Sequence, residues 1–124
     1  MKRFMVMLSM VAILLFAAQG FCADRDAIAK NVDAVVAAID GGKDAMSFAA
    51  DAYTPYVFIM QADGKLLVHP KLAGQDLKEK AMPIYQALQP ATPVGSWVKY
   101  EWDGKEKNTY AKKTKSNLTV ASGY

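Results

Sequence analysis

Residues 56–69, which read Tyr-Val-Phe-Ile-Met-Gln-Ala-Asp-Gly-Lys-Leu-Leu-Val-His, carry the strongest fold signal in the chain. Two runs, Tyr56–Gln61 and Lys65–His69, are rich in β-branched, aromatic and aliphatic side chains, and an Asp63-Gly64 step lies between them. Such a step between two such runs predicts a β-hairpin, because Asp and Gly tolerate the positive φ angles of a tight turn. The segment is therefore expected to form two antiparallel strands.

Helical patterns precede this hairpin. Five apolar residues recur at helical spacing over Asp24–Ile39, and the acidic Asp24 and Asp26 suit the positive end of a helix dipole. The five are Ile28, Val32, Val35, Val36 and Ile39. Gly41 and Gly42 should end this helix. A second helix is expected over Asp44–Tyr53, before Pro55, with one face made of Ala45, Phe48, Ala49 and Ala52.

A crossing helix and three more strands are expected after the hairpin. Asp76 and Glu79 have capping-box spacing at the start of a helix that continues to Leu88, and Pro83 is expected to kink it. The later strands are Trp97–Trp102, Thr109–Thr114 and Leu118–Tyr124, with turns at Asp103-Gly104 and Ser116-Asn117. The order predicts an α+β domain: a five-stranded antiparallel sheet with helices on one side, a long N-terminal helix and a crossing helix. This architecture is PAS-like.

The motifs of this domain resemble those of single Cache domains. The resemblance covers an aromatic strand, Asp63-Gly64, an aliphatic strand, His69-Pro70 and then Leu72-Ala-Gly-Gln-Asp-Leu77. The later segments Gly95–Trp102, Lys107–Tyr110 and Ser122–Tyr124 are similar to the later strands of the same family, so nearly the whole domain is covered.

The first 23 residues are interpreted as a signal peptide. Lys2 and Arg3 precede an apolar run from Phe4 to Ala18, which is shorter than the ~20 residues that span a bilayer as a helix. Cleavage would leave a mature domain beginning at Ala23 or Asp24, which predicts two segments, 1–23 and 24–124, and a periplasmic or secreted location. Lipid anchoring at Cys22 is disfavoured, because the residue before a lipidated cysteine is normally small and here it is Phe21.

Composition argues against several classes of function. Export removes Lys2 and Arg3, so the 15 basic residues fall to 13 against 12 acidic ones, and no concentrated positive charge favours nucleic acid as a partner. A single histidine, no retained thiol pair and no glycine-rich phosphate loop argue against an enzyme, a metal site or any other cofactor. Neither a haem attachment motif nor a calcium loop is present.

The resemblance implies a function in ligand sensing. Single Cache domains are extracytoplasmic sensors of chemoreceptors and histidine kinases, and they often bind small carboxylates such as acetate, propionate, lactate or pyruvate. The chain ends at Tyr124 without a second membrane span, so a free-standing periplasmic binding domain is expected, one that presents its ligand to, or docks on, a membrane receptor or histidine kinase. The alternative is a structural, partner-docking module without a ligand. The N-terminal helix is a candidate for homodimer formation.

Five residues are candidates for contacting a small organic acid, which needs hydrogen-bond donors when it leaves water. They are Tyr56, His69, Tyr100, Lys107 and Tyr110. Alternation along a regular strand places Val98, Tyr100 and Trp102 on the apolar face and Trp97 outward. Lys107, at the lysine position of the family, and Tyr110 are the preferred donors, Tyr56 shares an apolar wall with Phe58 and Met60, and His69 has an alternative, structural role in tying the strand end to the next loop.

Overall fold

One antiparallel sheet of five strands organises the chain, in the order β2-β1-β5-β4-β3. The computed structural model describes residues 24–124, and the predicted signal peptide lies outside the described residues. The strands are β1 (Val57–Met60), β2 (Leu66–Val68), β3 (Ser96–Trp102), β4 (Lys105–Lys113) and β5 (Thr119–Gly123). The β1–β2 and β3–β4 hairpins and the α+β class are confirmed, although β4 begins four residues earlier than predicted.

The β3–β4 turn shows why this hairpin has a fixed register. Asp103 and Gly104 have φ angles of 54° and 76°, which is the pattern of a type I′ turn. The turn pairs Trp102 with Lys105, and the pairing continues down to Ser96 and Ala111. The register determines which side chains of β3 and β4 share a face.

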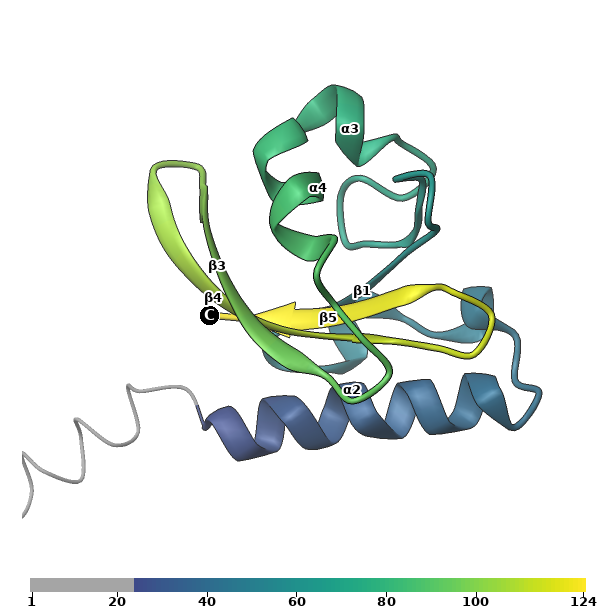
Figure 1. The fold of residues 1–124 in the computed structure, drawn as a ribbon. Coiled ribbons are helices and arrows are strands. Elements are labelled where there is room, and N and C mark those ends of the chain that lie inside the picture. Colours follow the sequence, from purple (N-terminus) through teal and green to yellow (C-terminus); the bar gives the residue numbers. More distant parts are fainter. Residues whose placement is uncertain (1–23) are drawn as a thin grey trace, which may run out of the picture.

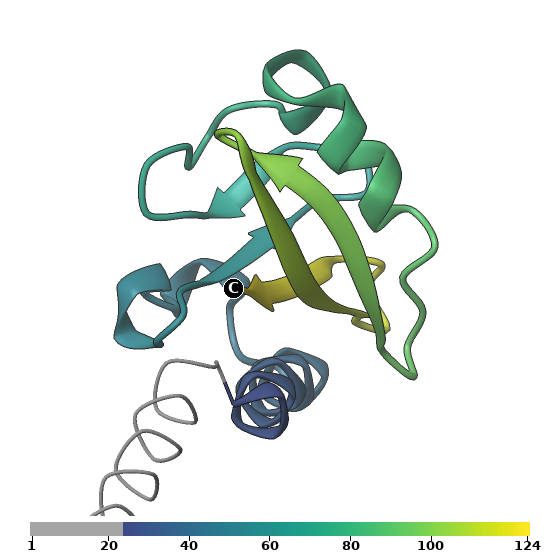
Figure 2. The ribbon, with the colours of Figure 1, turned by 90° about the vertical axis from the view of Figure 1, so that its left-hand side faces the viewer.

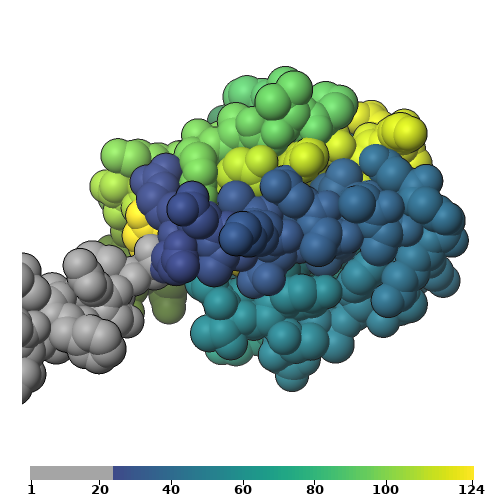
Figure 3. Space-filling view, turned by 90° about the horizontal axis from the view of Figure 1, so that it is seen from below, coloured from purple at the N-terminus to yellow at the C-terminus, as the bar shows by residue number. Residues whose placement is uncertain are grey.

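Helix α2 (Arg25–Asp40) covers one face of the sheet, as Figures 1 and 2 show. It begins where Asp24 Oδ1 accepts hydrogen bonds from the backbone N–H groups of Asp26 and Ala27, at 3.0 and 3.2 Å. Its buried residues Val32, Val35 and Val36 pack with Val57, Ile59 and Val120 of the sheet. Seen from below, the helix lies across the surface of the domain (Figure 3). The predicted N-terminal helix is confirmed.

Two short helices, α3 (Leu77–Lys80) and α4 (Met82–Leu88), cover the opposite face. Leu77, Ile84 and Leu88 pack there in one cluster with Phe58 and other residues of the sheet. The expectation that the helices lie on one side of the sheet is therefore wrong. The physical reason is visible in β1, where all four residues are buried, so both faces of the central strands need an apolar cover.

The helix expected over Asp44–Tyr53 is also wrong. The segment forms two 3₁₀ turns, η1 (Ala45–Ser47) and η2 (Ala50–Ala52), separated by extended backbone at Phe48 and Ala49. Because a ten-residue helix is marginal by itself, its conformation depends on tertiary packing. The two turns bury Ala45 and Ala50, while Ala49 and Ala52 are exposed.

The crossing helix is confirmed, but it breaks at Ala81 instead of bending at Pro83. Ala81 has φ −158° and ψ 72°, outside the helical region. A continuous helix would set the ring of Pro83 against the carbonyl of Glu79, four residues earlier, so α4 starts afresh with its proline in the first turn. Among residues 24–124, no helix has both the length and the apolar character needed to cross a membrane.

Candidate functional site

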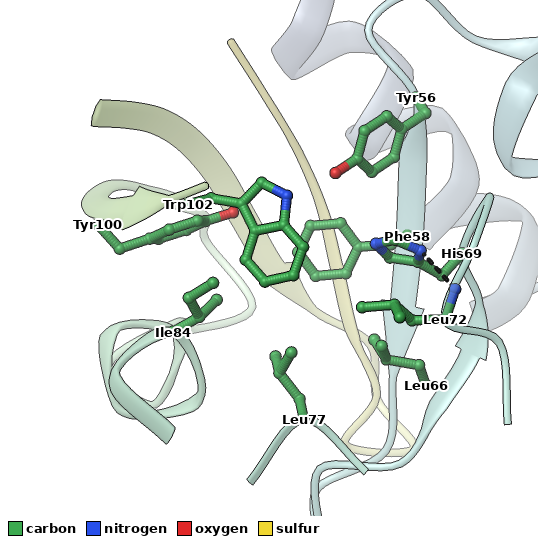
Figure 4. Close-up of a pocket in the computed structure, with 9 residues that line it drawn as sticks. All are labelled: Tyr56, Phe58, Leu66, His69, Leu72, Leu77, Ile84, Tyr100 and Trp102. Atoms are coloured by element: carbon green, nitrogen blue, oxygen red, sulfur yellow. Dashed lines mark hydrogen bonds between the residues drawn. The ribbon is translucent and has the colours of Figure 1, made fainter. Parts of the chain in front are cut away.

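A cleft opens between the α3–α4 face of the sheet and the loop that follows β2 (Figure 4). The space between the side chains of its inner part is about 300 Å³ when adjoining open solvent is counted, although the room that is free for a bound molecule is close to that of one water. Aromatic and aliphatic side chains line it: Tyr56, Phe58, Leu66, His69, Leu72, Leu77, Ile84, Tyr100 and Trp102. Its outer part, of about 390 Å³, is lined by Tyr56, His69, Pro70, Lys71, Leu72 and Trp102. The parts share four residues and form one cleft.

Strand alternation brings the aromatic walls together. Tyr56 and Phe58 are two residues apart on one side of the cleft, and Tyr100 and Trp102 are two residues apart on β3. Because successive side chains of a strand point to opposite faces, each pair lies on the same face. In Figure 4 the Tyr56 hydroxyl points toward the side of the cleft that carries Trp102. The predicted shared face of Tyr100 and Trp102 is confirmed.

Tyr100 is the most buried phenol of the cleft. Its oxygen accepts a hydrogen bond from Thr109 Oγ1 at 3.0 Å, which leaves the phenolic hydrogen able to donate. Burial raises the pKa of Tyr100 to about 12, and the hydrogen bond from Thr109 opposes this rise. Tyr100 therefore stays neutral at physiological pH and can serve a ligand as a hydrogen-bond donor.

His69 holds the loop after β2 in place. Its Nδ1 accepts hydrogen bonds from the backbone N–H groups of Lys71 and Leu72, both at 3.0 Å. The ring packs edge-on against Tyr56, with 5.3 Å between ring centroids, and lies 6.0 Å from Phe58. Burial, and then the charge of Lys71, lowers the pKa of His69. The structural role predicted for His69 is present, and the same ring lines the cleft.

One lysine lines the cleft, and a second, Lys107, lies beside Tyr56 outside the lining. Lys107 pairs across the hairpin with Tyr100, and its Nζ lies 5.7 Å from the ring centroid of Tyr56. Burial, and then Lys105, lowers the pKa of Lys107. Lys71 lines the outer part, and none of the described residues that line either part is an Asp or a Glu. The cleft therefore combines a mostly apolar lining with the hydrogen-bond donors Tyr56, His69 and Tyr100 and with positive charge in or beside its outer part.

Tyr110 does not reach this cleft, so the predicted grouping of Tyr110 with Lys107 is wrong in geometry. Tyr110 lies on the α2 face, where its hydroxyl donates to Asp33 Oδ1 at 3.3 Å and its ring is 5.5 Å from that of Trp97. Lys107 and Tyr110 are three positions apart on a regular strand, and an odd separation places two side chains on opposite faces. The odd separation of Lys107 and Tyr110 could have been read from the sequence.

Trp97 is on the opposite face from Tyr100, as predicted, but it does not simply point into solvent. The guanidinium of Arg25 lies over its ring at 4.0 Å from the centroid, and the ring of Tyr124 is 6.3 Å away. These contacts half-bury Trp97 beneath the start of α2. The helix that covers this face could not be anticipated from β3 alone.

Seven residues that line the cleft were not predicted from the sequence as site residues: Leu66, Pro70, Lys71, Leu72, Leu77, Ile84 and Trp102. Trp102 has the same strand parity as Tyr100, so its position could have been inferred. Leu72 comes from the loop tied by His69, and Ile84 comes from α4. Neither of the last two carries a local signal, because only the packing of these segments over the sheet brings them to the cleft.

Comparison with known proteins gives little further information. No family model matches the chain, and no curated protein matches it. A solved structure described as the ligand binding domain of Mlp24 with asparagine matches with a TM-score of 0.42 and 18% sequence identity. The match covers 55% of this chain and 27% of that one, so this chain spans about a quarter of that structure.

Within residues 24–124, no group of three or more His, Cys, Asp or Glu side chains is placed to hold a metal ion.

Proposed function

We propose that this chain is an exported, sensor-type domain that binds a small organic acid in the cleft and catalyses no reaction. The observation that carries the proposal is an apolar cleft that is lined by hydrogen-bond donors and Lys71, has Lys107 beside it, and contains no carboxylate in its described lining. Binding sites for small molecules commonly combine an apolar lining with a few polar groups that set the orientation of the ligand. The motif resemblance to single Cache domains points the same way.

An anionic head group suits the hydrogen-bond donors and positive charges in and beside this cleft. A carboxylate that leaves water needs several hydrogen-bond donors, and charged donors are the strongest. Tyr100 can offer a phenolic hydrogen, the neutral His69 carries its proton on Nε2, and Lys107 adds a positive charge beside Tyr56. A ligand ammonium group would find no Asp or Glu among the described lining residues.

The size of the cleft favours a short ligand. The inner part is nearly filled by its own side chains and leaves room for about one water molecule. The outer part is roomier and is the part to which Lys71 and Pro70 contribute. A C2–C4 carboxylate would occupy the outer part and direct one carboxylate oxygen inward toward Tyr100.

The proposed setting is outside the cytoplasm. After removal of residues 1–23, the domain would work in the periplasm or as a secreted protein and report ligand occupancy to a membrane receptor or histidine kinase. The dimer proposed for such a sensor would form through α2. The nearly filled inner part supports a second candidate, in which the domain docks on its partner without a ligand.

Two matched tyrosine variants test ligand binding. The purified domain is screened by thermal shift and calorimetry against C2–C4 carboxylates, amino acids and amines, since a ligand at 100 times its Kd adds ~2.7 kcal/mol to stability. Tyr100→Phe should lower the affinity for whichever carboxylate binds in the screen by roughly tenfold, because the substitution removes a hydrogen-bond donor to a charged group. Tyr110→Phe removes the same hydroxyl from the opposite face and should leave affinity unchanged.

The outcomes separate the two candidates. Binding of a carboxylate that is weakened by Tyr100→Phe and by Lys107→Ala but not by Tyr110→Phe supports the sensor proposal. A domain that binds no compound of any of the three classes favours the docking module. Equal effects of the two tyrosine variants would contradict the assignment of the ligand to this cleft.

A further inference from the structure

One ring nitrogen of His69 accepts the hydrogen bonds that shape the wall of the outer part of the cleft. His69 Nδ1 is the acceptor for two backbone donors, the N–H groups of Lys71 and Leu72. The turn that these bonds close supplies four of the outer lining residues, His69 through Leu72. Figure 4 shows the ring beside that of Phe58, with a hydrogen bond directed to the loop. The two hydrogen bonds therefore require a neutral imidazole whose proton is on Nε2.

We propose that His69 is a positioning residue that holds the outer wall only while it is neutral, so that acidification opens this wall and weakens ligand binding. The effect on binding rests on the proposed function, but the opening of the turn does not. An imidazolium carries hydrogen on both nitrogens. Protonated Nδ1 would face two N–H donors and lose both hydrogen bonds, so the charged ring and the closed turn are incompatible.

The surroundings of His69 do not compensate for a positive charge. Tyr56 and Phe58 of the first strand region face the ring, Lys71 belongs to the same turn, and Lys107 of β4 adds a further cation beside Tyr56. None of the described lining residues is acidic. Protonation would therefore bring a charge into a half-buried aromatic site that already carries positive charges nearby.

The direction of the pH dependence follows from this geometry. In the open turn the imidazole would titrate near its ordinary value of about 6.5, whereas burial and Lys71 lower the pKa of His69 in the closed turn. The closed turn is thus fully favoured above about pH 6.5 and loses its advantage as the pH falls through the lowered pKa. Since His69 is the only histidine in the sequence, no other imidazole contributes.

The variant His69→Asn can keep the hydrogen bonds of the turn while it removes the titrating imidazole. An Asn oxygen can accept hydrogen bonds from backbone N–H groups two residues on, as in an Asx turn, and it does not titrate. NMR of the ligand-free wild-type domain should show the Lys71 and Leu72 amide signals shifting together as the pH falls from about 7.5 to about 5. The protection factors of these two amides, which compare the observed exchange rate with the intrinsic rate at each pH, should fall over the same range. In His69→Asn these signals should stay constant over the same range.

Binding of the probe ligand supplies the second readout. With whichever of acetate, propionate, lactate and pyruvate binds best, wild-type affinity for the ionised acid should fall severalfold over this pH range, while that of His69→Asn stays flat. Affinities are expressed per ionised acid because the ligand itself gains protons near pH 5. Wild-type amides that do not titrate would overturn the proposal, as would an affinity that rises on acidification, which would make His69 a cationic ligand anchor. If none of the four acids binds, the proposed function fails, and the amide signals still decide whether the turn opens.

Discussion

Burial sets the chemistry of each polar side chain at the cleft. Tyr100, with a pKa of about 12, remains a neutral donor across the physiological range. Burial acts in the opposite direction on bases and lowers the pKa of both His69 and Lys107. The three residues therefore differ in what they offer a ligand. Tyr100 offers a phenolic hydrogen, His69 an imidazole hydrogen and Lys107 a positive charge. This division follows from where the fold places each group.

A prediction at the scale of one residue concerns the close approach of β5 to β4. A Cβ atom at Gly123 would lie 2.5 Å from the carbonyl oxygen of Asn108 and would also overlap Thr109. Since backbone atoms cannot move aside cheaply, Gly123→Ala should lower the free energy of unfolding by about 1–3 kcal/mol, measured by denaturant titration. Gly41→Ala, whose nearest neighbour would be 3.3 Å away, should change it by less than about 1 kcal/mol. Equal stabilities would contradict the observed register.

At the scale of elements, β3 links the two layers of the molecule. One of its faces carries Tyr100 and Trp102 to the cleft, and the other carries Trp97 to Arg25 at the start of α2. The α3–α4 pair in turn sets Leu77 and Ile84 against the cleft. The site is therefore assembled by the sheet and the crossing helices together.

The cap of α3 offers a prediction at this scale. Asp76 Oδ1 accepts a hydrogen bond from the backbone N–H of Lys78 at 2.8 Å and begins the helix that carries Leu77. Asp76→Ala should destabilise the domain by about 1 kcal/mol, while Asp76→Asn, which keeps a capping oxygen, should cost much less. Thermal denaturation of both variants measures the difference. A loss of the same size in both would show that the charge, and not the cap, stabilises this end.

The whole molecule has two apolar layers separated by one sheet. Val57 and Ile59 face α2, and Phe58 and Met60 face the crossing helices, so successive residues of β1 belong to different cores. None of the buried residues of the α2 layer lines the cleft, whereas the other layer forms its floor, and Tyr56 packs against both layers. The division separates residues that support the fold alone from residues that also shape the cleft.

Two neighbouring substitutions test this division. Ile59→Ala and Phe58→Ala should each lower the free energy of unfolding by about 2–5 kcal/mol, because both side chains are buried. Only Phe58→Ala should alter ligand affinity, since Phe58 lines the cleft and Ile59 lies on its far side. Stability is read from denaturant titration and affinity from calorimetry below the melting range. A comparable change in affinity for Ile59→Ala would mean that the two layers are coupled.

The sequence by itself determined the strands, the turn residues, the N-terminal helix and the α+β class, because hydrophobic periodicity, Asp-Gly steps and helix caps are local signals. Strand parity also placed Tyr100 with Trp102. Three features were decided only by tertiary structure: the helices on both faces, the two 3₁₀ turns of residues 45–52, and the contribution of Leu72 and Ile84 to the cleft. Each depends on how distant segments share buried surface, and no local pattern encodes which face of a sheet a distant helix will cover.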